Sequence, residues 1–217
     1  MILLDAGTSY AKILEQGNLR VVRTEDLPDG FRADAACGHS AARFSDSTLN
    51  ELVALARGGM SLIGEKSFVL LDVGARDMKS VTVESGKLAG CNWNDSCGAL
   101  CGFTLEIVSR QFCVDWRAVE PSDRGIRVTC GIFALSEMLD SIASGIPASE
   151  AAARLARGMA GMAEIFAGRP KRLFLSGGLC ENPAYMNSFE CEVVPLGRGV
   201  TIEGLKVSGF PEKKRGS

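Results

Sequence analysis

The chain has 217 residues, of which 46% are apolar and 23% charged, so it can bury a core as one large domain or two small ones. Its formal net charge of −2 argues against nucleic acid or an anionic membrane as a partner, because both call for a concentrated basic surface. Only residues 1–4 precede Asp5, too few for a signal peptide, and no apolar run approaches the roughly 20 residues of a membrane span. We therefore expect a cytoplasmic protein.

The chain carries eight cysteines, which is many for a reducing compartment. Without secretion they are not expected to form a disulfide framework, so metal or redox chemistry becomes worth testing. Four of the eight fall between Cys91 and Cys113, and Cys130 follows. The middle third of the chain is the place to look for such chemistry.

The first quarter of the sequence predicts strand, polar turn, strand, turn, strand. The strands are expected at residues 1–4, 11–14 and 19–22, with the polar turn at residues 5–9. A helix is predicted over residues 47–57, closed by Gly58 and Gly59.

The same layout then recurs. An apolar strand at residues 68–71 enters a second Asp-x-Gly turn at Asp72, and a strand at residues 80–83 and a glycine turn at residues 85–87 follow. Two copies of one supersecondary unit indicate an internal duplication. We expect a trimmed first subdomain over residues 1–65, a second subdomain with the cysteine-bearing helices over residues 66–210, and a polar tail over residues 211–217.

Helices dominate the second half. One is predicted over residues 97–112, with Ala99, Phe103 and Ile107 along one face, and another from about Cys130. A third is predicted from Ser149, and its apolar face would comprise Leu155, Met159, Met162 and Phe166. A strand at residues 173–175 leads into Gly177 and Gly178, and Asn182-Pro183 is typical of the start of a helix.

The two Asp-x-Gly turns carry groups that bind phosphate. Backbone N–H groups and hydroxyls suit phosphate oxygens, and an aspartate can hold hydrated Mg²⁺. A single Asp-x-Gly hairpin is more often a plain turn, but the repeat favours a nucleotide site. The candidates are Asp5, Gly7, Thr8, Ser9 and Lys12 in the first turn, Asp72, Gly74, Asp77 and Lys79 in the second, and Gly177 and Gly178, where the lack of a Cβ allows close approach.

Three such loops in this order resemble the phosphate and adenosine motifs of the superfamily that contains actin and sugar kinases. Within it, residues 71–79 (Leu-Asp-Val-Gly-Ala-Arg-Asp-Met-Lys) resemble the Asp-Ile-Gly-Gly-Gln-Asp-x-Lys motif of the ATPases that activate 2-hydroxyacyl-CoA dehydratases and benzoyl-CoA reductases. Residues 93–97 (Trp-Asn-Asp-Ser-Cys) resemble that family's Met-Asn-Asp-Lys-Cys, and residues 130–137 its Cys-Thr-Val-Phe-Ala-Glu-Ser-Glu. The similarity spans about residues 1 to 205.

The resemblance implies an α/β, duplicated ribonuclease-H-like (actin-like ATPase) fold of two small subdomains with a nucleotide cleft between them. It implies ATP or ADP with Mg²⁺ as ligands, with Asp5 and Asp72 serving the metal and the attacking water. It also implies that Cys97 and Cys130 ligate iron. A [4Fe–4S] cluster commonly takes four thiolates, so two per chain imply one cluster shared across a homodimer, as the family uses.

The leading hypothesis is an ATPase that couples hydrolysis to electron transfer, reducing a partner iron–sulfur dehydratase or reductase. Ala75, Arg76 and Leu100 depart from the family's motifs, which favours an alternative: a non-hydrolysing member that acts as a nucleotide- or cluster-binding regulatory or assembly subunit. A second alternative is a small-molecule kinase of the same superfamily, in which the cysteines are incidental. Cys91, Cys101 and Cys113 match no metal-binding spacing and are expected to be core residues or to lie around the cluster ligands.

Overall fold

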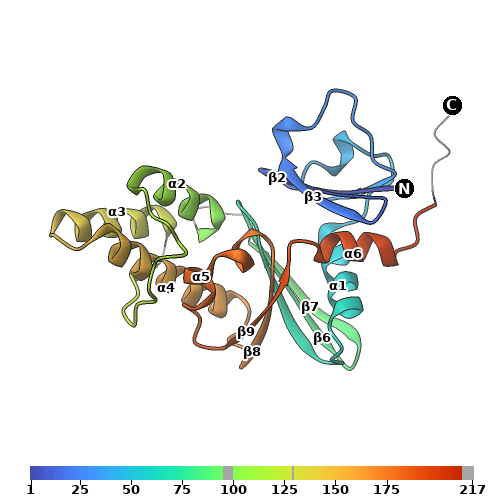
Figure 1. Ribbon diagram of the computed structural model, residues 1–217. Coiled ribbons are helices and arrows are strands. Elements are labelled where there is room, and N and C mark those ends of the chain that lie inside the picture. Colours follow the sequence, from blue (N-terminus) through green and yellow to red (C-terminus); the bar gives the residue numbers. More distant parts are fainter. Residues whose placement is uncertain (95–99, 129, 212–217) are drawn as a thin grey trace. The chain divides into compact units, whose positions relative to one another are not determined.

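The computed structural model describes residues 1–94, 100–128 and 130–211 (Figure 1). The chain forms two compact units of mixed α/β structure. One unit comprises Met1–Phe68, Val81–Cys91 and Arg198–Ser217, and the other comprises Val69–Ser80 and Asn92–Gly197. None of the helices in the described part of the chain has the length and apolar content that a membrane span needs.

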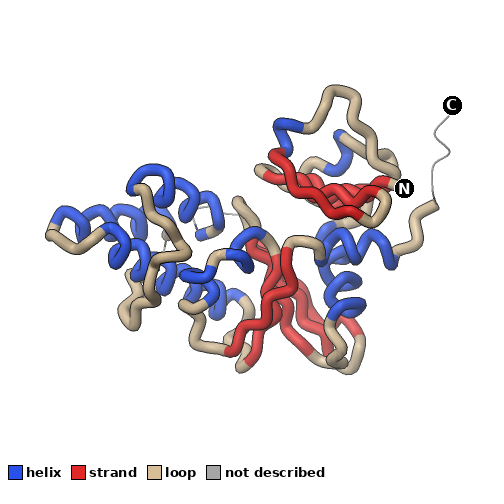
Figure 2. Tube along the Cα trace, viewed as in Figure 1, coloured by secondary structure: helices blue, strands red, loops and turns tan. Residues whose placement is uncertain are grey.

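The first sheet has four strands in the order β3 (Asn18–Arg23), β2 (Tyr10–Glu15), β1 (Ile2–Ala6) and β4 (Ala35–Cys37), drawn in red in Figure 2. β1 pairs antiparallel with β2 and parallel with β4. All of β1 is buried, and β2 buries Ala11 and Ile13, as expected for strands that pack one face on a core. The three strands predicted for this region are confirmed.

The second sheet has five strands. Their order is β7 (Lys87–Asn94), β6 (Met78–Glu84), β5 (Phe68–Val73), β8 (Arg172–Ser176) and β9 (Glu192–Gly197). β5 pairs parallel with β8, and β8 pairs parallel with β9. The same arrangement recurs in the two sheets. β1 lies between β2 and its parallel partner β4, and β5 lies between β6 and its parallel partner β8. The predicted internal duplication is therefore confirmed. β7 was not predicted as a strand, and its residues are almost all exposed.

Two helices of the first unit pack closely together: α1 (Glu51–Leu62) and α6 (Val200–Val207). The side chain of Asn50 accepts the N–H groups of Leu52 and Val53, which starts α1 at Glu51 rather than at residue 47. Gly58 and Gly59 are buried inside the helix. The prediction that they end it is wrong, because a Cβ on Gly58 would lie 1.9 Å from the carbonyl oxygen of Val200, so this glycine serves helix packing.

The remaining helices belong to the second unit. They are α2 (Gly102–Phe112), α3 (Gly131–Ala143), α4 (Ala148–Phe166) and the short α5 (Pro183–Met186). Single 3₁₀ turns occur at Thr24–Asp26, Ala41–Arg43 and Gly178–Glu181. α4 begins after Pro147, and Ser149 lies in its first turn rather than at its cap. Asn182 caps α5 as predicted, because its side chain accepts the N–H of Tyr185.

The apolar face predicted for this helix, with Phe103 and Ile107, is not the face of α2 that packs on the core. Phe103 is 54% exposed and Ile107 is also exposed, whereas Leu105 and Val108 are buried. α3 likewise leaves Ile132 and Phe133 exposed and buries Ala134 and Met138. Periodicity alone places two apolar stripes on such a helix, and only packing decides which one faces the core.

Candidate nucleotide-binding loops and cysteines

Asp5 is the centre of the first loop. It lies in β1 opposite Lys12 of β2, so the two side chains share a face of the sheet and Lys12 Nζ reaches Asp5 Oδ2 at 2.7 Å. Thr201 Oγ1, near the start of α6, donates to the same oxygen at 2.7 Å. Asp5 is 1% exposed, and within the described residues no donor hydrogen-bonds to its Oδ1. The structure therefore holds a buried carboxylate with one oxygen available as an acceptor.

The backbone around Asp5 is packed tightly. Gly38 has φ +94°, and a Cβ there would lie 2.7 Å from both Asp5 Oδ1 and the carbonyl oxygen of Ala6. Thr24 Oγ1 donates to the carbonyl oxygen of Gly7 at 2.8 Å, which holds the turn that carries Thr8 and Ser9. A side chain at position 38 would fill the space beside the carboxylate, so the glycine is required there.

Cys37 ends β4 opposite Asp5. Burial raises the pKa of this thiol well above its usual value, and the negative charge of Asp5 raises it further. The thiol therefore stays protonated at neutral pH.

The second and third loops lie together at the carboxyl ends of β5 and β8, two neighbouring inner strands of the second sheet. β5 and β8 are parallel with Asp72 opposite Ser176, and Ser176 Oγ donates to Asp72 Oδ1 at 2.5 Å. Gly177 follows with φ +89°, and a Cβ there would lie 2.4 Å from the carbonyl oxygen of Val73. Among the described residues, leaving out its two chain neighbours, no atom lies within 4 Å of a Cβ built on Gly178. Parallel strands place their carboxyl ends together, which is where α/β proteins bind ligands.

The second loop also holds a buried cation. Lys79 is 2% exposed, and its Nζ lies 2.6 Å from Asp77 Oδ1. Gly74 N–H donates to the carbonyl oxygen of Asp77 at 3.0 Å and closes the turn. The predicted residues therefore follow one another along a hairpin: Asp72 lies near the end of β5, Gly74 and Asp77 in the turn, and Lys79 at the start of β6.

Of the two predicted iron ligands, Cys130 lies within the described residues. Cys97 lies outside the described residues. Cys130 is the residue that precedes α3 and is partly exposed, next to Ile132 and Phe133, which are 70% and 71% exposed. Of the other cysteines of the middle third, Cys101 is buried, as expected, whereas Cys91 and Cys113 are exposed and so are not core residues. That these two lie around the cluster ligands stays a prediction. Among the described residues no group of three or more His, Cys, Asp or Glu side chains could hold a metal ion.

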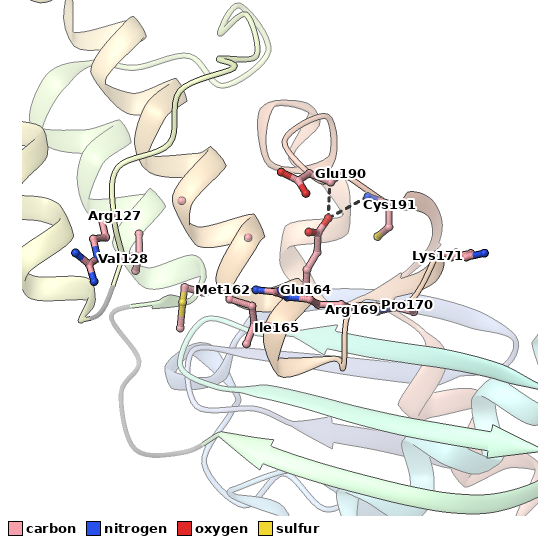
Figure 3. A pocket seen from close by; sticks show the side chains of 12 residues that line it. Arg127, Val128, Met162, Glu164, Ile165, Arg169, Pro170, Lys171, Glu190 and Cys191 are labelled. Carbon is pink, nitrogen blue, oxygen red and sulfur yellow. Dashed lines mark hydrogen bonds between the residues drawn. The ribbon is translucent and has the colours of Figure 1, made fainter.

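A pocket of about 680 Å³ lies beside α4 and contains none of the predicted site residues (Figure 3). Its wall includes Glu164, whose Oε1 accepts the backbone N–H groups of Glu190 and Cys191. Burial, followed by the charge of Glu164, raises the pKa of the Cys191 thiol to about 11. Glu164 therefore anchors the segment before β9, and Cys191 is not a reactive thiol at neutral pH.

Replacing Glu164 tests this anchoring role. Glu164→Leu is expected to lower the free energy of unfolding by about 2 to 3 kcal/mol, because two partly buried N–H groups lose a charged acceptor. Glu164→Gln keeps an oxygen acceptor and should lose about half as much. Urea denaturation measures both, and a Leu variant as stable as the parent would contradict the role.

Comparisons with known proteins show one sequence relative and several structures of similar fold. No family model matches the sequence. The (R)-2-hydroxyglutaryl-CoA dehydratase activating ATPase of Acidaminococcus fermentans is 24% identical over 192 residues, which cover 84% of this chain and 72% of that protein. The resemblance of the sequence to the dehydratase activators is therefore confirmed.

Two solved structures share the fold. The activator of the 2-hydroxyisocaproyl-CoA dehydratase from Clostridium difficile, with bound ADPNP, has a TM-score of 0.79 at 19% identity, covering 97% of this chain and 94% of that one. The A. fermentans (R)-2-hydroxyglutaryl-CoA dehydratase component A has a TM-score of 0.78 at 20% identity, covering 97% of each chain. The duplicated ribonuclease-H-like, actin-like ATPase fold is confirmed.

Proposed function

We propose that this chain is an ATP-dependent activator that donates electrons to a partner iron–sulfur enzyme of the 2-hydroxyacyl-CoA dehydratase or benzoyl-CoA reductase type. The observation that carries the proposal is the sequence relationship to a dehydratase activating ATPase along most of the chain. The buried carboxylates of the two repeated loops and the nucleotide bound by a protein of the same fold support it. The activity would require anaerobic handling, because reduced iron–sulfur clusters react with oxygen.

The residues of the loops fit a magnesium nucleotide. Asp5 keeps one buried oxygen without a donor among the described residues, and such an orphaned acceptor suits a cation or a metal-bound water. Asp5 and Asp72 would hold Mg²⁺ and orient the attacking water. Thr8, Ser9 and Lys12 would bind phosphates with the Gly7 turn. Gly74 and Lys79 would do so in the second loop, where the Asp77 carboxylate would hold the Lys79 ammonium. The open space around Gly178, next to Gly177, suits the adenosine.

The position of Cys130 suits a thiolate ligand of an iron–sulfur cluster. It precedes the first turn of a 13-residue helix, where the dipole and the free N–H groups favour a thiolate and an anionic cluster. When bound, a [4Fe–4S] cluster supplies one-electron transfer. Cys97 and Cys130 of each chain would provide two of its four thiolates, and a second copy of the chain would provide the other two.

The exposed apolar side chains near Cys130 support such a homodimer. Ile132 and Phe133 follow Cys130 after Gly131 and are each about 70% exposed. Exposed apolar side chains of this size are typical of surfaces that another protein covers. In the proposed dimer they would exclude water from the shared site.

Of the two alternatives, the first rests on specific residues. Arg76 puts a cation, and Ala75 a side chain, where the resembled family has Gln and Gly, which favours a regulatory or assembly subunit that binds nucleotide without hydrolysing it. A small-molecule kinase of the same superfamily would leave the cysteines without a role. It predicts an iron-free protein that transfers phosphate to an acid or a sugar.

The leading proposal is tested by combining iron analysis with nucleotide measurements. Calorimetry should detect MgATP binding, and a phosphate-release assay should detect its hydrolysis. Cys130→Ala should lose most of the iron, as should Cys97→Ala, while Cys191→Ala, which removes a partly buried thiol elsewhere, should keep it. Full iron content in the Cys97→Ala or Cys130→Ala protein would refute the ligand assignment, and binding without phosphate release would favour the regulatory subunit.

A further inference from the structure

Trp93 makes two contacts to the second loop. It lies in β7, and its indole Nε1–H donates to Asp77 Oδ2 at 3.0 Å. The Nζ of Lys79 lies 5.3 Å from the centroid of the Trp93 ring. Asp77 Oδ1 accepts from Lys79 at 2.6 Å, so each of the three side chains contacts the other two. We call Asp77, Lys79 and Trp93 the Trp93 cluster.

The cluster stabilises a charge that is costly to bury. Lys79 is 2% exposed and Asp77 13%, and both the carboxylate and the aromatic ring stabilise the ammonium there. The carboxylate uses one oxygen for the ammonium and the other for the indole N–H. Trp93 can therefore hold Asp77 in place even when Lys79 turns toward another anion.

We propose that Trp93 is a positioning residue for nucleotide binding: it orients Asp77 and Lys79 so that the Lys79 ammonium can exchange between Asp77 and a nucleotide phosphate. This inference rests on the proposed function, because it gives Lys79 a phosphate partner. The resembled family has methionine at this position, and methionine offers neither an N–H donor nor an aromatic face. The cluster is thus a feature of this chain, and it lies next to the departures at Ala75 and Arg76.

Tryptophan fluorescence can test the cluster directly, because the chain has only two tryptophans. Trp116 donates to the carbonyl oxygen of Leu105 and takes no part in the cluster. Trp116→Phe therefore gives a protein whose emission comes from Trp93 alone, and it should bind MgATP like the parent. In that background Lys79→Met is expected to change the Trp93 emission without any nucleotide, because the cation near the ring is removed.

Substitutions of Trp93 itself provide a second test, in which nucleotide affinity is measured. Trp93→Leu is expected to weaken MgATP binding by about tenfold, and Trp93→Phe by about threefold, since phenylalanine keeps the aromatic face and loses only the N–H donor. MgATP should also change the Trp93 emission with the dissociation constant that calorimetry gives. Partial rescue by phenylalanine distinguishes positioning from a general loss of stability.

The outcomes separate this inference from the proposed function. Parental affinity in Trp93→Leu, or a Trp93 emission indifferent to Lys79→Met, would overturn the positioning role and leave the ATPase proposal standing. If the parent protein bound no MgATP, the proposed function and the exchange of Lys79 would both fail. The emission of the Lys79→Met protein would then still decide whether Trp93 contacts the ammonium in solution.

Discussion

Gly204→Ala is expected to destabilise the protein by about 3 kcal/mol or more, which lowers the melting temperature by about 10 °C. A Cβ at this position would lie 1.8 Å from the carbonyl oxygen of Ala54, and the matching contact, from Gly58 to Val200, is equally close. These are backbone atoms of two helices, so no side chain can move aside to relieve the overlap. α1 and α6, adjacent in Figure 1, would have to separate and give up the hydrogen bonds from Arg57 to Ser208 and from Ser61 to Glu203.

A matched glycine in another helix provides the control. Gly161 lies in α4, and a Cβ built there would meet no atom of another described segment within 4 Å. Gly161→Ala is expected to leave stability unchanged or raise it by up to about 1 kcal/mol, because alanine has the higher helix propensity. Differential scanning calorimetry compares the two. Equal melting temperatures for the two variants would contradict the packing described for α1 and α6.

Asp5→Asn is expected to reduce phosphate release by about 100-fold or more. The substitution keeps the shape of the side chain but removes the charge that would hold Mg²⁺ and orient the attacking water. It also removes the ion pair with Lys12, whose side chain is 14% exposed, so some loss of stability should accompany the loss of rate. The initial rate of phosphate release at saturating MgATP, per folded molecule, is the measurement.

Asp34→Asn separates the two effects. Asp34 is another buried carboxylate of the same unit, and its Oδ2 accepts the backbone N–H of Ile2 at the start of β1. This variant should lose stability and keep its rate of phosphate release per folded molecule. If Asp34→Asn slowed phosphate release as much as Asp5→Asn, the special role of Asp5 would be contradicted.

The sequence predicted the repeated part of the fold because local patterns encode it. The apolar strands before Asp5 and Asp72 alternate with turn residues, so the strands, the two turns and the duplication could all be inferred. The dipeptide Asn182-Pro183 was enough to predict the start of a helix, because asparagine caps helices and proline is favoured at their first position. The pairs Asp5–Lys12 and Asp77–Lys79 are each close in sequence and therefore could be expected to meet.

Contacts distant in sequence could not be predicted in this way. Thr201 reaches Asp5 across 196 residues, and no local pattern marks it as part of the first loop. The sequence suggests that Gly58 ends a helix. In the structure a glycine is needed there because the carbonyl oxygen of Val200, in α6, leaves no room for a Cβ. Trp93 was noted for its place in a motif, whereas its contacts to Asp77 and Lys79 depend on the position of β7 in the sheet. Each of these depends on tertiary packing rather than on local sequence.

The central claim is that two cysteines from each of two identical chains hold one cluster for an ATP-dependent electron donor. Anaerobic purification, followed by an absorption spectrum and iron analysis of the same sample, tests it most directly. We predict a brown protein with about two irons per chain, that is, four for each pair of chains. A colourless, iron-free protein that stays so after anaerobic incubation with iron and sulfide would contradict it.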